Sequence, residues 1–164
     1  MMRLIQNIEV NGIMKNLERN IMKTKIKRRF EIAKKAAMKS DFRVQVGCAV
    51  YYKNKLIAIG ASTNKTSPLQ KKYNVFRKFD RNSGNCLDKA HAEIIALSKI
   101  KKKNINMSEV VFYVVRVCKS EMLSMARPCP ACTMALMDAG VRKIFYTTEH
   151  NGYSMEVFGQ YKGG

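Results

Sequence analysis

Residues 90–93 read Ala-His-Ala-Glu, and residues 128–132 read Pro-Cys-Pro-Ala-Cys. His91, Cys129 and Cys132 are three ligands of the kind that Zn²⁺ accepts, and three protein ligands leave the fourth tetrahedral position open. A zinc ion with an open position lowers the pKa of bound water to near neutrality, and a carboxylate such as Glu93 can then transfer protons. The two stretches therefore predict a hydrolytic zinc site.

The surrounding residues place both stretches at the starts of helices. Apolar positions at helical spacing predict a helix over 90–103 that begins beside His91. A second helix is predicted over 128–139, with proline at its start. Cys129 opens it, and Cys132 is three residues on, so both sulfurs face the same way. The partial positive charge of helix N-termini stabilises thiolates, and sites of α/β proteins form where such termini meet at one sheet edge.

The other elements predict an α/β fold. A helix is expected over 27–40, and strands are expected over 43–52, 56–61, 110–117, 141–148 and 153–158. This order implies a mixed five-stranded sheet with helices on both faces, in three layers. We expect one domain over 1–164, with a basic extension over 1–26 and a long basic loop over 62–89. Within the extension, Ile13, Leu17 and Ile21 favour a short amphipathic helix.

Composition restricts the location of the protein. Its 164 residues suit one hydrophobic core, and no apolar run approaches the roughly 20 residues that a membrane helix needs. The first 20 residues lack the layout of a signal peptide. Five cysteines, an odd number with one CxxC pair, favour a reduced or metal-binding role. We therefore expect a cytoplasmic protein that does not bind membranes.

The net charge of +19, from 31 Lys and Arg against 12 Asp and Glu, predicts attraction to phosphates. A lysine-rich composition that only keeps the protein soluble is the alternative. In the 62–89 loop, lysines and arginines alternate with aromatic residues, a pattern that can hold phosphates and stack nucleobases. The same residues could instead form a lid packed by its own aromatic side chains. The candidate contacts in this loop are Lys71, Lys72, Tyr73 and Arg77.

The two motifs, in this α/β order, resemble the zinc signature of the cytidine and deoxycytidylate deaminase superfamily. The resemblance covers residues 44–148. It implies one catalytic Zn²⁺ on His91, Cys129 and Cys132, with Glu93 transferring protons from water to the base and to the departing ammonia. The substrate contacts that it implies are the backbone N–H of Ala92, a backbone carbonyl near Arg127 and Pro128, and Asn64 at the sugar.

The sequence does not decide between a monomeric substrate and a polynucleotide. One expectation is an enzyme that converts a cytosine nucleoside or nucleotide, such as deoxycytidylate, to the uracil form, with Arg127 and the 62–89 lysines at the phosphate. The second is a deaminase of cytosine or adenine in single-stranded DNA or tRNA. A terminal hairpin that includes residues 149–164, by contrast, resembles the free-nucleoside cytidine deaminases. Related enzymes are often oligomeric, so a homo-oligomer is possible.

A non-catalytic protein that binds nucleic acid is the alternative of another class. In it a fourth protein ligand would complete a structural zinc site. The candidates are His150, Cys48, Cys86 and Cys118, of which Cys48 and Cys118 are expected in the core and His150 on the surface.

Overall fold

A six-stranded mixed sheet forms the centre of the molecule in the computed structural model, which describes residues 2–77 and 87–159, with side chains from residue 11 onward. Five strands follow the order β2-β1-β3-β5-β6, and β4 pairs with β3. Only β3 and β5 run parallel. The strands are β1 (Gln45–Tyr52), β2 (Lys55–Ala61), β3 (Val110–Val117), β4 (Leu123–Ser124), β5 (Lys143–Thr147) and β6 (Tyr153–Val157). The five predicted strands are confirmed, and the two-residue β4 is an addition.

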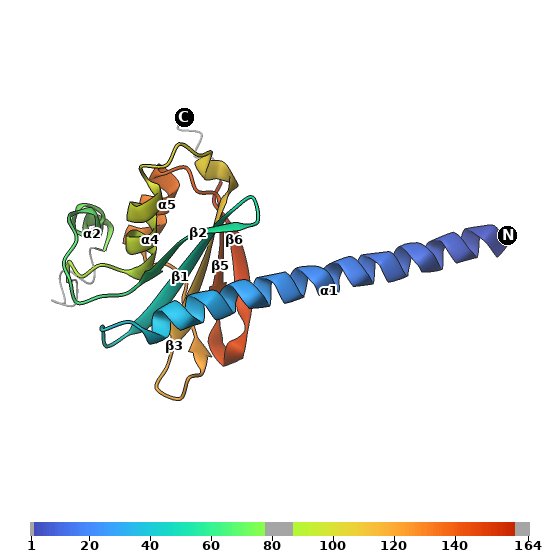
Figure 1. Cartoon of the computed structure of the whole chain (residues 1–164), viewed down its shortest axis with the longest axis horizontal. Coiled ribbons are helices and arrows are strands. Elements are labelled where there is room, and N and C mark those ends of the chain that lie inside the picture. The colour runs from blue at the N-terminus through green and yellow to red at the C-terminus, as the bar shows by residue number, and fades with distance from the viewer. Residues whose placement is uncertain (1, 78–86, 160–164) are drawn as a thin grey trace.

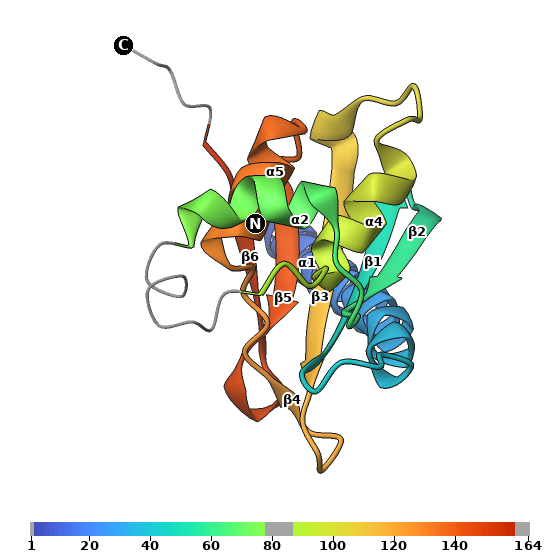
Figure 2. The same cartoon turned by 90° about the vertical axis from the view of Figure 1, so that its left-hand side faces the viewer.

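Helices cover both faces of this sheet, which confirms the predicted three-layer α/β fold (Figures 1 and 2). One hydrophobic cluster joins α1 to residues such as Tyr113 and Val115, and the other joins α4 and α5 to residues such as Phe112 and Val114. Successive residues of β3 thus serve opposite layers, as strand geometry requires. The helices are α1 (Met2–Met38), α2 (Pro68–Tyr73), α4 (Ala92–Ile100) and α5 (Pro130–Asp138), with 3₁₀ turns η1 (Asn74–Phe76), η2 (Met107–Glu109) and η3 (Glu149–Asn151).

The N-terminal helix differs from the prediction. Instead of a short helix within 1–26 and a separate helix over 27–40, one helix of 37 residues runs from Met2 to Met38. The segment between the two predicted helices holds no proline or glycine, so nothing in it ends the backbone hydrogen bonding. The first half of α1 projects away from the sheet (Figure 1), and Ile13, Leu17 and Ile21 are exposed there.

The 62–89 segment, predicted as an irregular connection, contains α2 and η1. Ser67 caps α2 by accepting a hydrogen bond from the Gln70 backbone N–H, and Pro68 occupies the first turn. The side chains that this segment buries include Gln70 and Asn74, which are polar, so hydrophobic periodicity did not predict these turns. Residues 78–86 lie outside the described part of the chain.

Two glycines let the layers approach closely. A Cβ atom at Gly47 would lie 2.0 Å from the Ala33 carbonyl oxygen of α1, and one at Gly60 would lie 2.3 Å from the Ala92 carbonyl oxygen of α4. Any other residue at these positions would push a helix off the sheet. Gly60 therefore sets the distance between β2 and the first turn of α4, which directly follows the predicted histidine ligand.

Candidate metal and substrate site

Both halves of the predicted site lie where a helix begins. His91 is the residue that precedes α4, and Cys129 is the residue that precedes α5, each with extended backbone angles. The prediction placed these two helices a residue or two earlier. Because the first backbone N–H groups of a helix lack partners within it, the site lies beside two sets of free donors and two positive helix ends.

The side chains of the three predicted ligands converge. The nitrogen and sulfur ligand atoms of His91, Cys129 and Cys132 all lie within 4.8 Å of one another. His91 Nδ1 lies 3.5 Å from the Cys129 sulfur and 3.3 Å from the Cys132 sulfur. In tetrahedral zinc, bonds of ~2.3 Å to sulfur and ~2.05 Å to nitrogen separate those two atoms by about 3.6 Å. The distances and the donor set therefore fit Zn²⁺.

The pKa values of the two cysteines are shifted in opposite directions. A hydrogen bond from Cys132, supported by His91, lowers the pKa of Cys129 to about 4 against the effect of burial. The same hydrogen bond and burial raise the pKa of Cys132. Desolvation opposes a charged His91, but its contacts with Cys129 and Glu93 outweigh this and raise its pKa. The lowered pKa of Cys129 favours the thiolate, the form of cysteine that binds metals.

Glu93 lies in the first turn of α4 and is 4% exposed. Burial raises the pKa of its carboxyl group, with His91 acting in the opposite direction. Its oxygens are not among the atoms of the three-ligand cluster. A buried carboxylate beside a metal site, with a raised pKa, is suited to accept and donate protons near neutral pH.

A buried chain of amides holds the loop before α4, and no pattern in the residues predicted it. The His91 backbone N–H donates to Gln70 Oε1 at 3.0 Å, and Gln70 Nε2 donates to Asn74 Oδ1 at 2.9 Å. Asn74 Nδ2 donates to Asp88 Oδ1, also at 2.9 Å. Gln70 and Asn74 are fully buried, so satisfied hydrogen bonds there fix the position of His91, the predicted metal ligand.

A cavity of about 520 Å³ opens over the cluster, with Glu93, His91 and Cys129 in its wall. Its charged lining is mostly basic. Among the described residues that line it, five are cationic and Glu93 is the one carboxylate. The cations are Arg43, Arg77, Lys89, Arg116 and Arg127. A cavity with this balance favours an anionic ligand.

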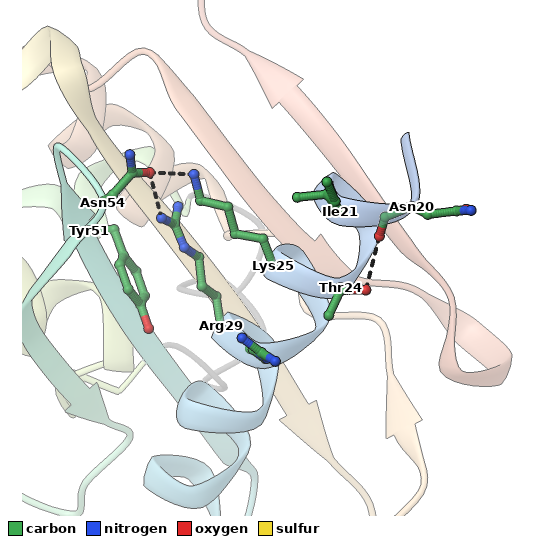
Figure 3. Close-up of a pocket in the computed structure, with 8 residues that line it drawn as sticks. Asn20, Ile21, Thr24, Lys25, Arg29, Tyr51 and Asn54 are labelled. Carbon is green, nitrogen blue, oxygen red and sulfur yellow. Dashed lines mark hydrogen bonds between the residues drawn. The ribbon is translucent and has the colours of Figure 1, made fainter. Parts of the chain in front are cut away.

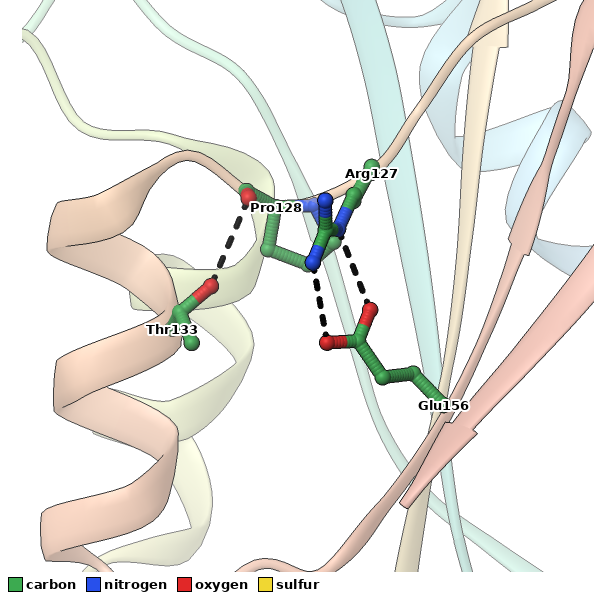
Figure 4. A network of polar contacts seen from close by, with 4 residues as sticks. All are labelled: Arg127, Pro128, Thr133 and Glu156. Atoms are coloured by element: carbon green, nitrogen blue, oxygen red, sulfur yellow. Dashed lines mark hydrogen bonds and ion pairs between the residues drawn. The ribbon is translucent and has the colours of Figure 1, made fainter. Parts of the chain in front are cut away.

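The substrate contacts implied by the family resemblance lie in different surroundings. Ala92 and Pro128 are buried beside the ligands, and the Pro128 carbonyl accepts a hydrogen bond from Thr133 Oγ1 at 3.4 Å. Arg127 lines the cavity, but its guanidinium forms two 3.1 Å hydrogen bonds to the Glu156 carboxylate (Figure 4). Asn64 is exposed, and its side chain donates to the Asp41 backbone carbonyl at 2.8 Å.

The loop residues proposed from the basic–aromatic pattern divide in two. Arg77 lines the cavity, and its Nη1 lies 3.4 Å from His91 Nε2. Lys71 and Lys72 are exposed on α2 and are not in the cavity lining. Tyr73 is buried, and its hydroxyl donates to Asp138 Oδ2 at 2.9 Å. Tyr73 therefore packs α2 against α5, and its ring is not exposed for stacking.

The alternative fourth ligands do not join the cluster within the described residues. Cys48 is buried, as predicted, whereas Cys118 is exposed, so its expected place in the core was wrong. Cys118 directly follows β3, beyond the buried residues of that strand. His150 is on the surface, as predicted, and Cys86 lies outside the described residues. The metal group found there holds three ligands.

None of the described helices is both long enough and apolar enough to cross a membrane. This finding includes α1, whose 37 residues carry many charges.

Comparison with known proteins agrees with this geometry. A family model for the cytidine and deoxycytidylate deaminase zinc-binding region matches residues 23–148. A cytidine deaminase from Burkholderia pseudomallei has a similar fold, with a TM-score of 0.56 and 18% identity over 79% of this chain and 90% of that one. For a dCMP deaminase from the cyanophage S-TIM5, the TM-score is 0.48 and the identity is 22%, over 81% of this chain and 86% of that one. The search of curated proteins gave no match.

The family model spans most of the chain, and its matched residues include His91, Glu93, Cys129 and Cys132. The Burkholderia pseudomallei structure, at this level of identity, shows a common fold. The chain therefore belongs to the cytidine and deoxycytidylate deaminase family.

Proposed function

We propose that the protein is a zinc-dependent hydrolytic deaminase that converts a cytosine nucleoside monophosphate, of the deoxycytidylate type, to the uracil form. One observation carries the proposal: His91, Cys129, Cys132 and the buried Glu93 meet at a cavity with a basic wall. The reaction consumes water and releases ammonia. The metal ligands and the carboxylate support the chemistry, and the cations support a phosphorylated substrate.

The residues around the cluster have separable roles in this reaction. Zinc, when bound by His91, Cys129 and Cys132, supplies a Lewis acid that activates water. Glu93 takes a proton from the attacking water, gives it to the ring nitrogen of the base, and later delivers a proton to the leaving amino group. The backbone N–H of Ala92, in the first turn of α4, has no partner within the helix and can donate to the base carbonyl.

The phosphate is assigned to cations other than Arg127. Glu156 neutralises Arg127 through a bidentate ion pair, so its charge is already matched. Arg43 and Arg116 are exposed and line the same cavity, and Lys89 lies in the segment before α4. A 5′-phosphate near Arg43 and Arg116 would interact with two arginines whose planar guanidinium groups suit phosphate oxygens.

A free cytosine nucleoside is the second candidate substrate. The chain ends its sheet with the antiparallel pair β5 and β6, joined through η3. This hairpin at the edge of the sheet is the feature that supports the second candidate. A nucleoside would not use the positive charge of the cavity, and this is why the monophosphate is preferred.

The test is ammonia release by the zinc-loaded protein from four substrates at equal ionic strength: deoxycytidine, deoxycytidylate, cytidylate and a cytosine-containing single-stranded oligonucleotide. We expect the highest kcat/KM on a monophosphate, with an advantage over deoxycytidine that shrinks as salt increases. Equal rates on deoxycytidine and deoxycytidylate would favour the second candidate. Activity on the oligonucleotide alone, or on none of the four, would contradict the proposal.

A further inference from the structure

A second basic cavity lies on the opposite side of the sheet, where α1 crosses the turn between β1 and β2 (Figure 3). Its volume is about 600 Å³. Lys25, Arg28 and Arg29 contribute three cations from one side of α1, and Tyr51 and Asn54 line the cavity from the hairpin. Cys129 and Glu93 belong to the other cavity, so this one is separate from the proposed catalytic site.

Arg29 is held rigidly at the inner wall of this cavity. It is 8% exposed, and its guanidinium carbon lies 4.1 Å from the centre of the Tyr51 ring and 5.3 Å from that of Tyr113. Arg29 Nη1 donates to the Tyr113 hydroxyl at 2.9 Å. The aromatic rings and this hydrogen bond fix the guanidinium without neutralising its charge.

A neutral amide is the shared acceptor for two of the cations. Asn54 Oδ1 accepts a hydrogen bond from Lys25 Nζ and another, at 3.0 Å, from Arg29 Nη2 (Figure 3). Asn54 has a left-handed backbone, with φ of 65°, which asparagine tolerates better than most residues. The turn thus brings an oxygen to the cations but no negative charge.

These cations have no acidic partner among the side chains of residues 11–77 and 87–159. The ion pair found there joins Arg127 to Glu156, on the other side of the molecule. Buried charges are normally paired, because an unpaired charge loses hydration without compensation. Within the described part of the chain, three converging cations, one of them nearly buried, therefore have no anion that balances them.

We propose that the cavity between α1 and the β1–β2 turn binds a phosphate group of a small anion. Arg29 would supply fixed donors at the inner wall, and Lys25 and Arg28 would supply two further cations from the same side of α1. Guanidinium and ammonium groups on one wall are the chemistry that holds phosphate oxygens. Free phosphate and the phosphate of a nucleotide share this chemistry.

The experiment titrates the full-length, zinc-loaded protein with inorganic phosphate at constant ionic strength set by chloride, using calorimetry. The test variant combines Lys25→Met with Arg28→Gln and keeps the packed Arg29. Its matched control combines Lys15→Gln with Lys35→Gln, which removes two exposed cations of α1 outside the cavity. A third variant, Arg43→Gln with Arg116→Gln, reports on the catalytic cavity. Circular dichroism verifies that each variant is folded.

We expect phosphate to bind this cavity with similar affinity in the wild type, the Lys15/Lys35 control and the Arg43/Arg116 variant. In the Lys25/Arg28 variant we expect binding at least about tenfold weaker. Adenosine 5′-phosphate binding more tightly than phosphate at this site, with adenosine inert, would identify a nucleotide as the source; equal affinity would identify free phosphate. Unchanged binding in the Lys25/Arg28 variant, an equal loss in the Lys15/Lys35 control, or loss only in the Arg43/Arg116 variant would each overturn the proposal. The last result leaves the proposed deaminase activity intact, because it assigns the phosphate to the catalytic cavity.

Discussion

Cys132 Sγ lies 3.3 Å from His91 Nδ1, although 41 positions separate the two residues in the sequence. This contact exists because α4 and α5 begin at the same edge of the sheet, with His91 and Cys129 directly before them. The two motifs of the sequence are thus one site in space. The central claim is that this site holds a zinc ion and that Glu93 transfers protons beside it.

Replacing one ligand should remove the metal. We expect Cys132→Ser to lose most of the zinc that the wild type retains through gel filtration, because a neutral hydroxyl does not replace a thiolate as a ligand. Cys118→Ser is the matched control, since Cys118 is exposed and outside the three-residue cluster. Elemental analysis gives the ratio of zinc to protein. Equal zinc in Cys132→Ser and the wild type would contradict the assignment of this ligand.

The metal-free protein should show a reactive cysteine at acidic pH. With a pKa of about 4, Cys129 is a thiolate above that pH and becomes protonated below it. Its alkylation by iodoacetamide should therefore continue at pH 6, where an ordinary thiol with a pKa of about 8.5 is almost fully protonated. Peptide mass spectrometry after chelation measures the rate, with glutathione as the reference thiol. A Cys129 rate that falls with pH in parallel with glutathione would contradict the prediction.

Gly60 should be required for the site although it carries no side chain. In Gly60→Ala the new methyl group would lie 2.3 Å from the Ala92 carbonyl oxygen and 2.8 Å from the Ala96 nitrogen, so α4 must move. We expect a loss of about 1–3 kcal/mol in the free energy of unfolding, with weaker zinc retention. Urea denaturation measures the first quantity.

Gly12→Ala is the control for that substitution. A Cβ atom at Gly12 would meet nothing within 4 Å, and the residue is inside α1. Alanine in a helix is favoured over glycine by about 0.5–1 kcal/mol, so this variant should be as stable as the wild type or slightly more so. A Gly60→Ala protein as stable as Gly12→Ala would show that the close approach of α4 to β2 has no energetic consequence.

The basic wall of the cavity should affect phosphorylated substrates selectively. Arg116→Gln should raise KM for deoxycytidylate by about tenfold, the effect of losing a charged hydrogen bond, and should leave deoxycytidine almost unaffected. Lys71→Gln removes an equal charge from α2, outside the cavity lining, and should change neither value. Steady-state ammonia release measures both substrates. An equal loss on both would mean that Arg116 does not contact the phosphate.

The fold was predictable where hydrophobic periodicity is strong. The strands around Val114 and Ile144 and the starts of α4 and α5 follow from apolar patterns, prolines and glycines, so the convergence of the three candidate ligands could be predicted. α1 was predicted in two pieces because residues 11–20 are all exposed, and an exposed helix has no apolar face to detect. The two-residue β4 is too short to give a strand pattern.

The surroundings of the ligands were not predictable to the same degree. Gln70 and Asn74 hold the His91 loop through buried amide hydrogen bonds, and polar residues in a basic segment look like any solvated loop. Arg43 and Arg116 reach the cavity from residues far apart in sequence, and only the pairing of β1 with β3 brings those segments together. The bidentate pair of Arg127 with Glu156 likewise depends on tertiary structure.

Glu93→Gln separates metal binding from proton transfer, because the amide keeps the shape of the side chain and removes its ability to accept a proton. Zinc content and ammonia release from deoxycytidylate are measured on the same preparation. The expected result is zinc equal to that of the wild type, with kcat lower by about 10²–10⁴-fold. Loss of zinc would make Glu93 a ligand, and turnover within a few-fold of the wild type would remove it from the chemistry; either result would contradict the account.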